Sequence, residues 1–208
     1  VSGNNVTANN ACGIGLSYSS NNSITGNNIA NNGLGICLHS SSGNSISGNN
    51  VTANDLEGIY LIHSSNNSVY HNNFVDNYWQ GASIASLTVW DDGYPSGGNY
   101  WSGYTGLDLY RGPYQNETGS DGIGDSPCGI DPNNLDHYPL MTPWTPLLIG
   151  DVNRDGIVDM ADIFKVIMAF GSYAGHPLWN PYADLNHDGR VDLVDIFAVI
   201  VNFGKTYP

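Results

Sequence analysis

Residues 48–70 read GNNVTANDLEGIYLIHSSNNSVY, and the chain repeats this pattern on either side. The preceding copies are GNNVTANNACGIGLSYSSNNSIT at 3–25 and GNNIANNGLGICLHSSSGNSIS at 26–47, and a fourth copy opens with HNNFVDN at 71–77. The copies start at Gly3, Gly26, Gly48 and His71, so their spacing is almost constant. A fixed period of this length is typical of solenoids, in which each repeat packs only on its neighbours.

Apolar residues occupy equivalent positions in the copies. The predicted columns are Val6, Ile29, Val51 and Phe74; Ile14, Ile36 and Ile59; Leu16, Leu38 and Leu61; and Ile24, Ile46 and Val69. Short alternating runs bounded by Asn, Gly and Ser indicate strands separated by turns. A coil of about 22 residues with short strands predicts a right-handed parallel β-helix of three to four coils. Two asparagine stacks are then expected, Asn5, Asn28, Asn50 and Asn73, and Asn22, Asn44 and Asn67.

These asparagine-rich repeats resemble the NosD-like β-helix repeats of surface proteins. Three later segments, GGNYWSGYTG (97–106), DGIGD (121–125) and IDPNNLDHYPLM (130–141), resemble the closing segment of such chains. We therefore expect repeats over residues 1–80 and an aromatic- and Gly-rich cap over 81–145. The resemblance implies a fold and not a function, because parallel β-helices carry lyases, hydrolases and plain stalks alike. The chain begins within a repeat, and an open end of a β-helix exposes unpaired strand edges, so we expect further coils upstream or a partner at that end.

Two segments near the C-terminus, DVNRDGIVDMAD (151–162) and DLNHDGRVDLVD (184–195), have the spacing of calcium-binding loops. Oxygen side chains recur at positions 1, 3, 5, 9 and 12, a glycine stands at the turn in position 6, and position 7 offers a backbone carbonyl. The predicted ligands are Asp151, Asn153, Asp155, Ile157, Asp159 and Asp162 in the first loop, and Asp184, Asn186, Asp188, Arg190, Asp192 and Asp195 in the second. Because eight of these are carboxylates, calcium should be coupled to folding.

An amphipathic helix is predicted after each loop, and prolines exclude a helix before it. The apolar positions are Ile163, Phe164, Val166, Ile167 and Phe170, then Ile196, Phe197, Val199, Ile200 and Phe203. A calcium loop with an exit helix only, present once from Asp151 and again from Asp184, resembles a type I dockerin, and we assign it to residues 146–208. The resemblance implies calcium as cofactor and a cohesin-like domain as partner. It also implies a partner-binding face at loop positions 10 and 11, which are Met160, Ala161, Leu193 and Val194 and so apolar here.

A third, incomplete loop pattern lies within the predicted cap. Glu117, Asp121, Ile123 and Asp125 fall at positions 1, 5, 7 and 9, with a glycine at the turn. The third position is Gly119 and the twelfth Cys128, neither of which supplies the usual ligand. A calcium ion and a simple Gly–Asp turn both account for this pattern.

Composition excludes several functions. The formal net charge is −14, with 5 Lys and Arg against 19 Asp and Glu, which argues against nucleic acid. No apolar run approaches the roughly 18 residues that span a bilayer. The three cysteines, Cys12, Cys37 and Cys128, are an odd number without a CxxC motif, so the sequence predicts neither a disulfide-stapled domain nor a zinc site. Cys12 and Cys37 lie three positions out of register, so no disulfide is expected between them. Residues 1–80 contain no Lys or Arg and only the acids Asp55, Glu57 and Asp76, so we expect no catalysis. Copper binding is not expected, because His39 and His63 are offset by one position.

The sequence therefore predicts an extracellular or cell-surface, non-catalytic β-helix protein attached through a calcium-dependent dockerin. One alternative is a fibre or surface-layer subunit that binds another copy of itself through the coil ends and the dockerin. Another is a carbohydrate-binding or carbohydrate-active protein with polysaccharide as ligand. The aromatic residues that could stack on sugars, or else pack the cap, are Trp79, Trp90, Tyr94, Tyr100, Trp101, Tyr104, Tyr110 and Tyr114.

Overall fold

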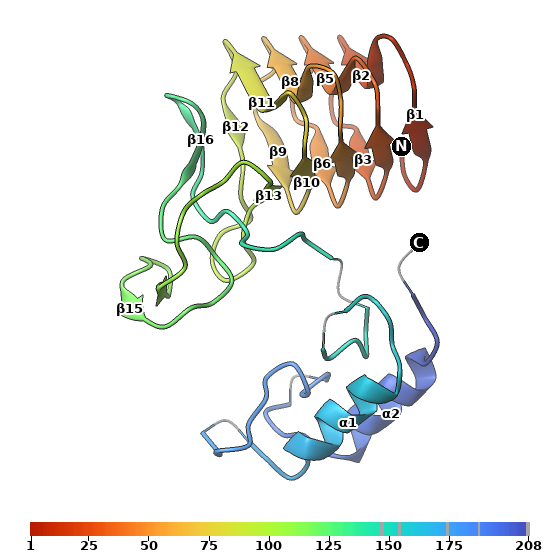
Figure 1. Ribbon diagram of the computed structural model, residues 1–208, viewed down its shortest axis with the longest axis vertical. Coiled ribbons are helices and arrows are strands. Elements are labelled where there is room, and N and C mark those ends of the chain that lie inside the picture. The colour runs from red at the N-terminus through yellow and green to blue at the C-terminus, as the bar shows by residue number, and fades with distance from the viewer. Residues whose placement is uncertain (146–147, 154, 174, 187, 207–208) are drawn as a thin grey trace. The chain divides into compact units, whose positions relative to one another are not determined.

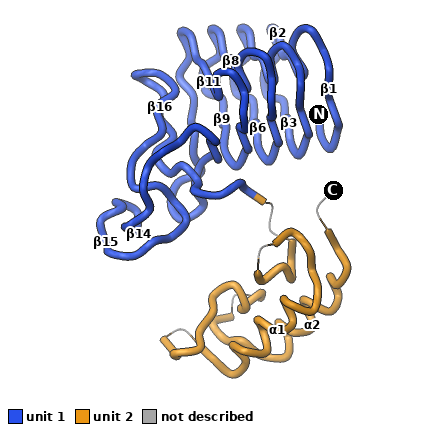
Figure 2. The backbone as a smooth tube through the Cα atoms, viewed as in Figure 1, with its two compact units in different colours: residues 1–144 blue, residues 145–208 orange. Residues whose placement is uncertain are grey.

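The computed structural model describes residues 1–145, 148–153, 155–173, 175–186 and 188–206. The chain forms two compact units, residues 1–144 and 145–208 (Figure 2). The boundary predicted from sequence, between 145 and 146, adjoins residues 146 and 147, which lie outside the described residues.

The first unit winds into a parallel β-solenoid of about four turns, as predicted (Figure 1). Each turn adds one strand to each of three parallel sheets. The first sheet holds β1 (Asn5–Thr7), β4 (Asn28–Ala30), β7 (Asn50–Thr52), β10 (Asn73–Val75) and β13 (Tyr100–Trp101). The second holds β2 (Cys12–Ser17), β5 (Leu34–His39), β8 (Glu57–Ile62) and β11 (Trp79–Ile84), and the third β3 (Ser23–Thr25), β6 (Ser45–Ser47), β9 (Asn67–Tyr70) and β12 (Thr88–Val89).

The register confirms the four apolar columns. Val6 pairs with Ile29, Ile29 with Val51 and Phe74 with Val51 in the first sheet, and the other columns pair in the same way. Most of these side chains are fully buried and form one continuous core cluster. Similar coils therefore stack similar side chains, and each turn buries its apolar face only against its neighbours.

Asparagine ladders run through the solenoid parallel to its axis. The predicted outer stack is joined from Asn28 to Asn5 at 3.0 Å and from Asn50 to Asn28 at 3.3 Å. The other predicted stack is confirmed as well, with Asn22 bonded to Asn44 at 3.1 Å and Asn44 to Asn67 at 3.0 Å. Two further ladders, which sequence reasoning missed, link Asn4, Asn27, Asn49, Asn72 and Asn99, and Asn9, Asn32, Asn54 and Asn77. In both, each oxygen Oδ1 accepts the backbone N–H and the amide N–H₂ of the equivalent asparagine one turn earlier. The ladders thereby satisfy polar groups that the coil corners bury.

The cap follows the last turn and contains two antiparallel hairpins. They are formed by β14 (Tyr110–Arg111) with β15 (Glu117–Thr118), and by β16 (Cys128–Asp131) with β17 (Asn134–Asp136). Trp90 and Trp101 are buried in the solenoid core, and the ring of Trp101 stacks on Phe74 with centroids 4.6 Å apart. The cap therefore extends the apolar core beyond the last coil.

The structure corrects the cysteine prediction. Cys12 and Cys37 form a disulfide, with their Cα atoms 6.1 Å apart. Cys12 does pair with Leu34, and Gly15 with Cys37, so the offset of three positions is real. However, β2 bends between Cys12 and Gly15, and a Cβ on Gly15 would lie 3.7 Å from that of Cys12. The bend places Cys12 beside Gly15 and hence within reach of Cys37, which counting along straight strands overlooks.

The second unit contains two helices, α1 (Met160–Ala169) and α2 (Leu193–Asn202). Its core is formed by Val152, Val158, Val166, Ala169, Ala183, Val191 and Val199. Each helix begins within the last positions of a predicted calcium loop and continues beyond it, as the sequence indicates. Among the described residues, no helix is long and apolar enough to cross a membrane.

Candidate metal sites and docking surface

The predicted ligands at the start of each loop converge. The backbone N–H of Asp155 lies 3.2 Å from Asp151 Oδ1 and 3.0 Å from Asn153 Oδ1. One N–H reaches two oxygens only where those oxygens are neighbours. The second loop repeats both contacts at the backbone N–H of Asp188, each at 3.1 Å. Positions 1, 3 and 5 therefore come together in both loops.

The glycine at position 6 closes the turn. The N–H of Gly156 donates to Asp151 Oδ2 at 2.9 Å, with Gly156 in the left-handed region at φ +87°. Gly189 makes the same bond to Asp184 at 2.9 Å with φ +85°. A side chain at either position would strain this backbone, which explains why the motif has glycine there.

The predicted ligands at positions 9 and 12 also start the helices. Asp162 is fully buried, and its carboxylate accepts backbone N–H groups from Val152 at 2.7 Å, Asn153 at 2.9 Å and Asp159 at 2.8 Å. Asp159 caps α1 by accepting the N–H of Ala161 at 2.7 Å. The same capping box recurs at α2. Position 12 thus ties both ends of its loop to the first turn of the helix.

The donor set of each loop fits calcium. Calcium prefers hard oxygen ligands, usually six to eight of them, and each loop supplies five oxygen side chains and a backbone carbonyl. The first ion would be held by Asp151, Asn153, Asp155, Asp159, Asp162 and the carbonyl of Ile157, and the second by Asp184, Asn186, Asp188, Asp192, Asp195 and the carbonyl of Arg190. A bound cation would neutralise the carboxylates that each loop draws together.

Each loop is also paired with the segment that follows the helix of the other half. Val158 donates its N–H to Lys205 and accepts from Gly204, at 2.9 and 2.8 Å. Val191 makes the equivalent pair with Ser172 and Gly171, at 3.0 and 2.8 Å. The two halves therefore exchange their exit segments symmetrically. Folding of one loop is coupled to the other through this exchange.

Both helices present apolar side chains to solvent. The predicted partner-face residues Met160, Ala161, Leu193 and Val194 are all exposed. Phe164 and Phe197 are 62% and 61% exposed, although the sequence pattern places them on the buried side of an amphipathic helix. Further exposed residues that occupy equivalent positions in the two halves are Ile167 and Ile200, Met168 and Val201, and Phe170 and Phe203.

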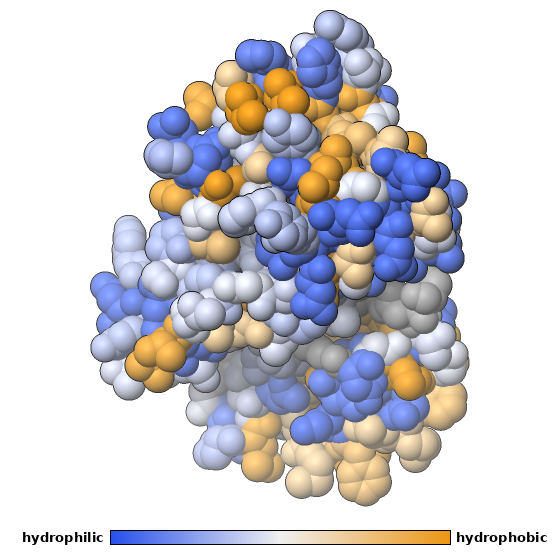
Figure 3. Space-filling view, turned by 45° about the horizontal axis from the view of Figure 1, so that its top comes forward, coloured by the Kyte–Doolittle hydropathy of each residue, from blue (hydrophilic) through white to orange (hydrophobic). Residues whose placement is uncertain are grey.

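We call the exposed apolar residues of both helices together the apolar helix face. It consists of Met160, Ala161, Phe164, Ile167, Met168 and Phe170 in the first half and Leu193, Val194, Phe197, Ile200, Val201 and Phe203 in the second. Residues of high hydropathy, drawn in orange, are visible at the surface in Figure 3. Each helix buries only a narrow stripe, Asp162, Val166 and Ala169 in α1. The sequence contains a signal for this exposure: both helices are apolar nearly all round, whereas a helix at the surface of a monomer has one polar side.

The residues of the third predicted loop have other partners. Glu117 lies 3.8 Å from Arg111. Each oxygen of Asp125 accepts a backbone N–H, and Asp121 accepts two further backbone N–H groups and the side-chain amide of Gln115. Ile123 is buried in the cap. These contacts describe well-formed turns, and the third calcium site stays a prediction.

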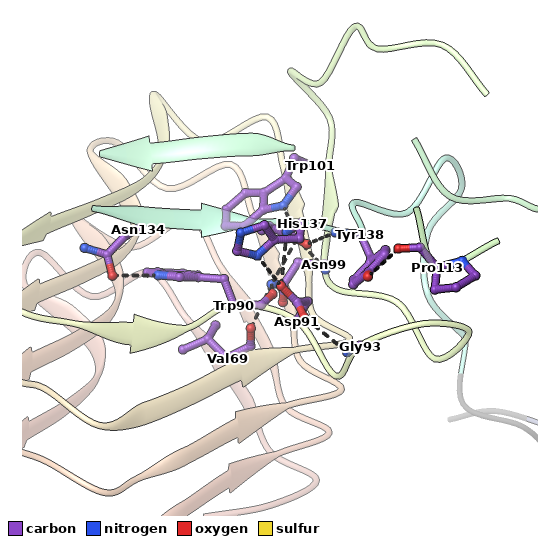
Figure 4. A network of polar contacts seen from close by, with 11 residues as sticks. Val69, Trp90, Asp91, Gly93, Asn99, Trp101, Pro113, Asn134, His137 and Tyr138 are labelled. Carbon is purple, nitrogen blue, oxygen red and sulfur yellow. Dashed lines mark hydrogen bonds and ion pairs between the residues drawn. The ribbon is translucent and has the colours of Figure 1, made fainter. Parts of the chain in front are cut away.

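The inner side of the cap holds a buried carboxylate, Asp136, at the end of the buried ladder that runs from Asn4 to Asn99, which we call the inner asparagine ladder. Figure 4 shows Asn99 and Trp101, the two residues that donate to this carboxylate. Its Oδ2 accepts the backbone N–H of Asn99 and the indole N–H of Trp101, each at 2.8 Å. Burial raises the pKa of Asp136 to about 6, against these stabilising hydrogen bonds. Burial, together with the charge of Asp136, also raises the pKa of the free thiol of Cys128 to about 11.

The histidines of the coils lie apart. His39 is opposite Ile62, so His63 follows one position later, as the sequence indicates. His71 has a different environment, stacked on Trp144. Across the described part of the chain, the structure brings no three His, Cys, Asp or Glu side chains together as a preformed metal cluster.

Taken together, the fold and the paired loops define a parallel β-solenoid protein that carries a duplicated loop–helix module. The family model described as periplasmic copper-binding protein (NosD) matches residues 1–106, and that described as dockerin type I domain matches residues 149–203. The chain belongs to the NosD family and bears a C-terminal type I dockerin domain. Searches of curated proteins and of solved structures found no match. Type I dockerins bind calcium and cohesin domains, and proteins that carry them are secreted, in keeping with the disulfide.

Proposed function

We propose that this protein is an extracellular, non-catalytic solenoid that is attached to a larger assembly through its calcium-loaded dockerin. The observation that carries the proposal is the apolar helix face, which repeats in both halves of the module. Burying one side chain such as Met160 or Leu193 contributes about 1.5–3 kcal/mol, so a face of this composition favours a protein partner over solvent.

In this proposal the dockerin binds its partner only when its loops hold calcium. The same residues that would hold the ions also cap α1 and α2, so the helices and their apolar side chains are positioned by the loops. Loss of calcium would leave carboxylates crowded at both helix starts, and the docking surface would lose its support. Attachment should therefore be reversible by chelation.

The test is titration of the full chain with a panel of purified cohesin domains, in millimolar calcium and again in excess chelator. We expect binding by at least one domain in calcium only. The double variant Met160→Asp/Leu193→Asp should raise its Kd more than tenfold, because charges replace two buried contacts. Tyr114→Asp, an exposed residue of the first unit, is the matched control and should bind as the parent does. A folded, calcium-loaded chain that binds none of the domains and instead forms large calcium-dependent oligomers would replace this proposal with the self-assembling fibre.

The coils also present one candidate carbohydrate site. Tyr78 and Trp79 are 71% and 60% exposed, with ring centroids 5.6 Å apart. Trp79 pairs in register with Glu57, and Asp55 is exposed two residues before Glu57. Aromatic rings beside carboxylates suit a neutral glycan, since no Lys or Arg occurs before Arg111 to pair with an anionic one. Titration with neutral polysaccharides should change the Trp fluorescence of the parent and not that of Trp79→Ala, whereas equal responses would exclude this site.

A further inference from the structure

Trp144, the last residue of the first unit, is held on the flank of the solenoid. The side-chain amide of Asn73 makes two hydrogen bonds to the backbone of Trp144. It accepts the Trp144 N–H at 2.7 Å and donates to the Trp144 carbonyl at 2.9 Å. The indole ring stacks on the imidazole of His71, with centroids 5.1 Å apart and planes within 7°. Main chain and side chain of Trp144 are thus both bound by one coil.

The indole ring also needs a glycine beneath it. A Cβ on Gly48 would lie 3.1 and 3.4 Å from two carbons of the Trp144 ring. Gly3 and Gly26 occupy the same position in the preceding copies, with the same left-handed φ, and a Cβ on either would meet nothing within 4 Å. Of these three equivalent glycines, only Gly48 has a side chain above it, and that side chain is Trp144.

The residues that hold Trp144 depart from the repeat. His71 adopts φ +57° at the position where the three earlier copies have glycine. A bulky residue in this region is strained by about 1 kcal/mol or more, so its presence calls for a compensating contact. The ring of His71 is also held at its edge, with Nε2 3.0 Å from the carbonyl oxygen of Ser96.

Asn73 departs from the outer asparagine ladder in the same way. Asn28 and Asn50 each donate to the asparagine one turn earlier. The amide of Asn73 instead turns to the backbone of Trp144. The coil that receives Trp144 thus uses two residues differently from its neighbours.

We propose that Gly48, His71 and Asn73 form a docking seat for Trp144, which fixes where the chain leaves the solenoid on its way to the dockerin. With Trp144 seated, four Cα steps lead to Leu148, which packs against the core of the dockerin module, a contour of about 14 Å. Without the seat, the last anchor is Met141, whose N–H donates to Gly122 at 3.0 Å, and the contour grows to about 25 Å. Because the volume within reach scales with the cube of the contour, the seat limits the volume that the dockerin module can explore to roughly one sixth of that without the seat. A smaller volume raises the effective concentration of a ligand bound to one unit as seen by a ligand bound to the other. The seat does not depend on the identity of the docking partner.

The test compares Gly48→Ala with Gly26→Ala in the full, calcium-loaded chain. Both variants place a Cβ at the same left-handed backbone conformation, and only the first meets Trp144. We expect hydrogen exchange at the Trp144 amide to be at least tenfold faster in Gly48→Ala than in Gly26→Ala and the parent. The ring protons of His71 should show an upfield shift in the parent that Gly48→Ala reduces. Equal exchange rates in the two variants, or an unprotected Trp144 amide in the parent, would overturn the seat.

A second variant removes the ring without altering the solenoid. Trp144→Ala should abolish the upfield shift of His71 and shorten the rotational correlation time of the dockerin in ¹⁵N relaxation measurements. Lys205→Ala, a surface change within the dockerin, is the control and should leave both unchanged. An unchanged correlation time in Trp144→Ala would refute the positioning role, even if the stacking contact itself is real.

Discussion

Replacing Asn49 with alanine removes one rung of the inner asparagine ladder. Asn49 is fully buried. Its oxygen accepts the backbone and side-chain N–H groups of Asn27 at 3.0 and 2.9 Å. Its amide nitrogen donates to Asn72 at 2.9 Å, to the Ile24 carbonyl at 2.9 Å and to the Ser47 carbonyl at 3.1 Å.

The expected loss of stability follows from these contacts. Alanine leaves the backbone N–H of Asn27 buried without a partner, at about 1–3 kcal/mol, and each further lost hydrogen bond contributes about 0.5–1.5 kcal/mol. Two amide hydrogens serve three acceptors, so the sum is reduced, and we expect about 3–5 kcal/mol in total. Asn50 is the matched control, because it is the next residue in the same coil, is exposed and makes a 3.3 Å contact. Asn50→Ala should change stability by about 0.5 kcal/mol or less.

The assay is urea unfolding of both variants, followed by fluorescence of the buried tryptophans in excess calcium and again with chelator, which separates the dockerin transition. For a urea dependence of about 2–3 kcal/mol/M, Asn49→Ala should lower the solenoid midpoint by about 1–2 M. Midpoints that agree within about 0.2 M between the two variants would refute the claim that the inner ladder, and not the outer one, supports the fold.

Three further predictions concern single sites. Asp155→Ala should weaken calcium binding at least tenfold and unfold the dockerin while the coils stay folded; a dockerin that keeps its helicity by circular dichroism in excess chelator would contradict this. Cys12→Ser/Cys37→Ser should destabilise the solenoid by about 3 kcal/mol, since the disulfide closes a separation of 25 residues, with faster hydrogen exchange confined to the first two coils. Burial raises the pKa of Asp136 from 3.8 to about 6, so its protonated form stabilises the fold below pH 4 and this contribution is lost as the pH rises through 6. Relative to Asp136→Asn, the parent should therefore gain up to about 3 kcal/mol between pH 7 and pH 4, and parallel urea midpoints across that range would show that Asp136 titrates normally.

The cysteines and the helices show where reasoning from sequence stopped. The predicted offset of Cys12 and Cys37 is correct, yet the bend of β2 between Cys12 and Gly15 brings the two cysteines together, and a bend leaves no trace in a count of positions. The apolar pattern of α1 and α2 was also read correctly. Whether Phe164 is buried depends on how much surface the rest of the module can cover, and a unit this small covers only a stripe of each helix.

The sequence by itself determined the solenoid and the two loop–helix repeats of the dockerin. Both are local patterns repeated at fixed offsets: the apolar columns recur once in every coil, and each loop places its ligands within one short segment, so spacing alone brings the groups together. Only the tertiary structure decided the disulfide, the inner ladder that ends at Asp136, the exposure of the helix face and the seat of Trp144. The inner ladder follows the repeat period, but only the structure shows that its side chains are buried and bonded. The disulfide and the seat join residues at separations outside that period, such as Asn73 with Trp144, so they depend on bends and on the path of the cap. The exposure of the helix face depends on how much surface the rest of the module covers.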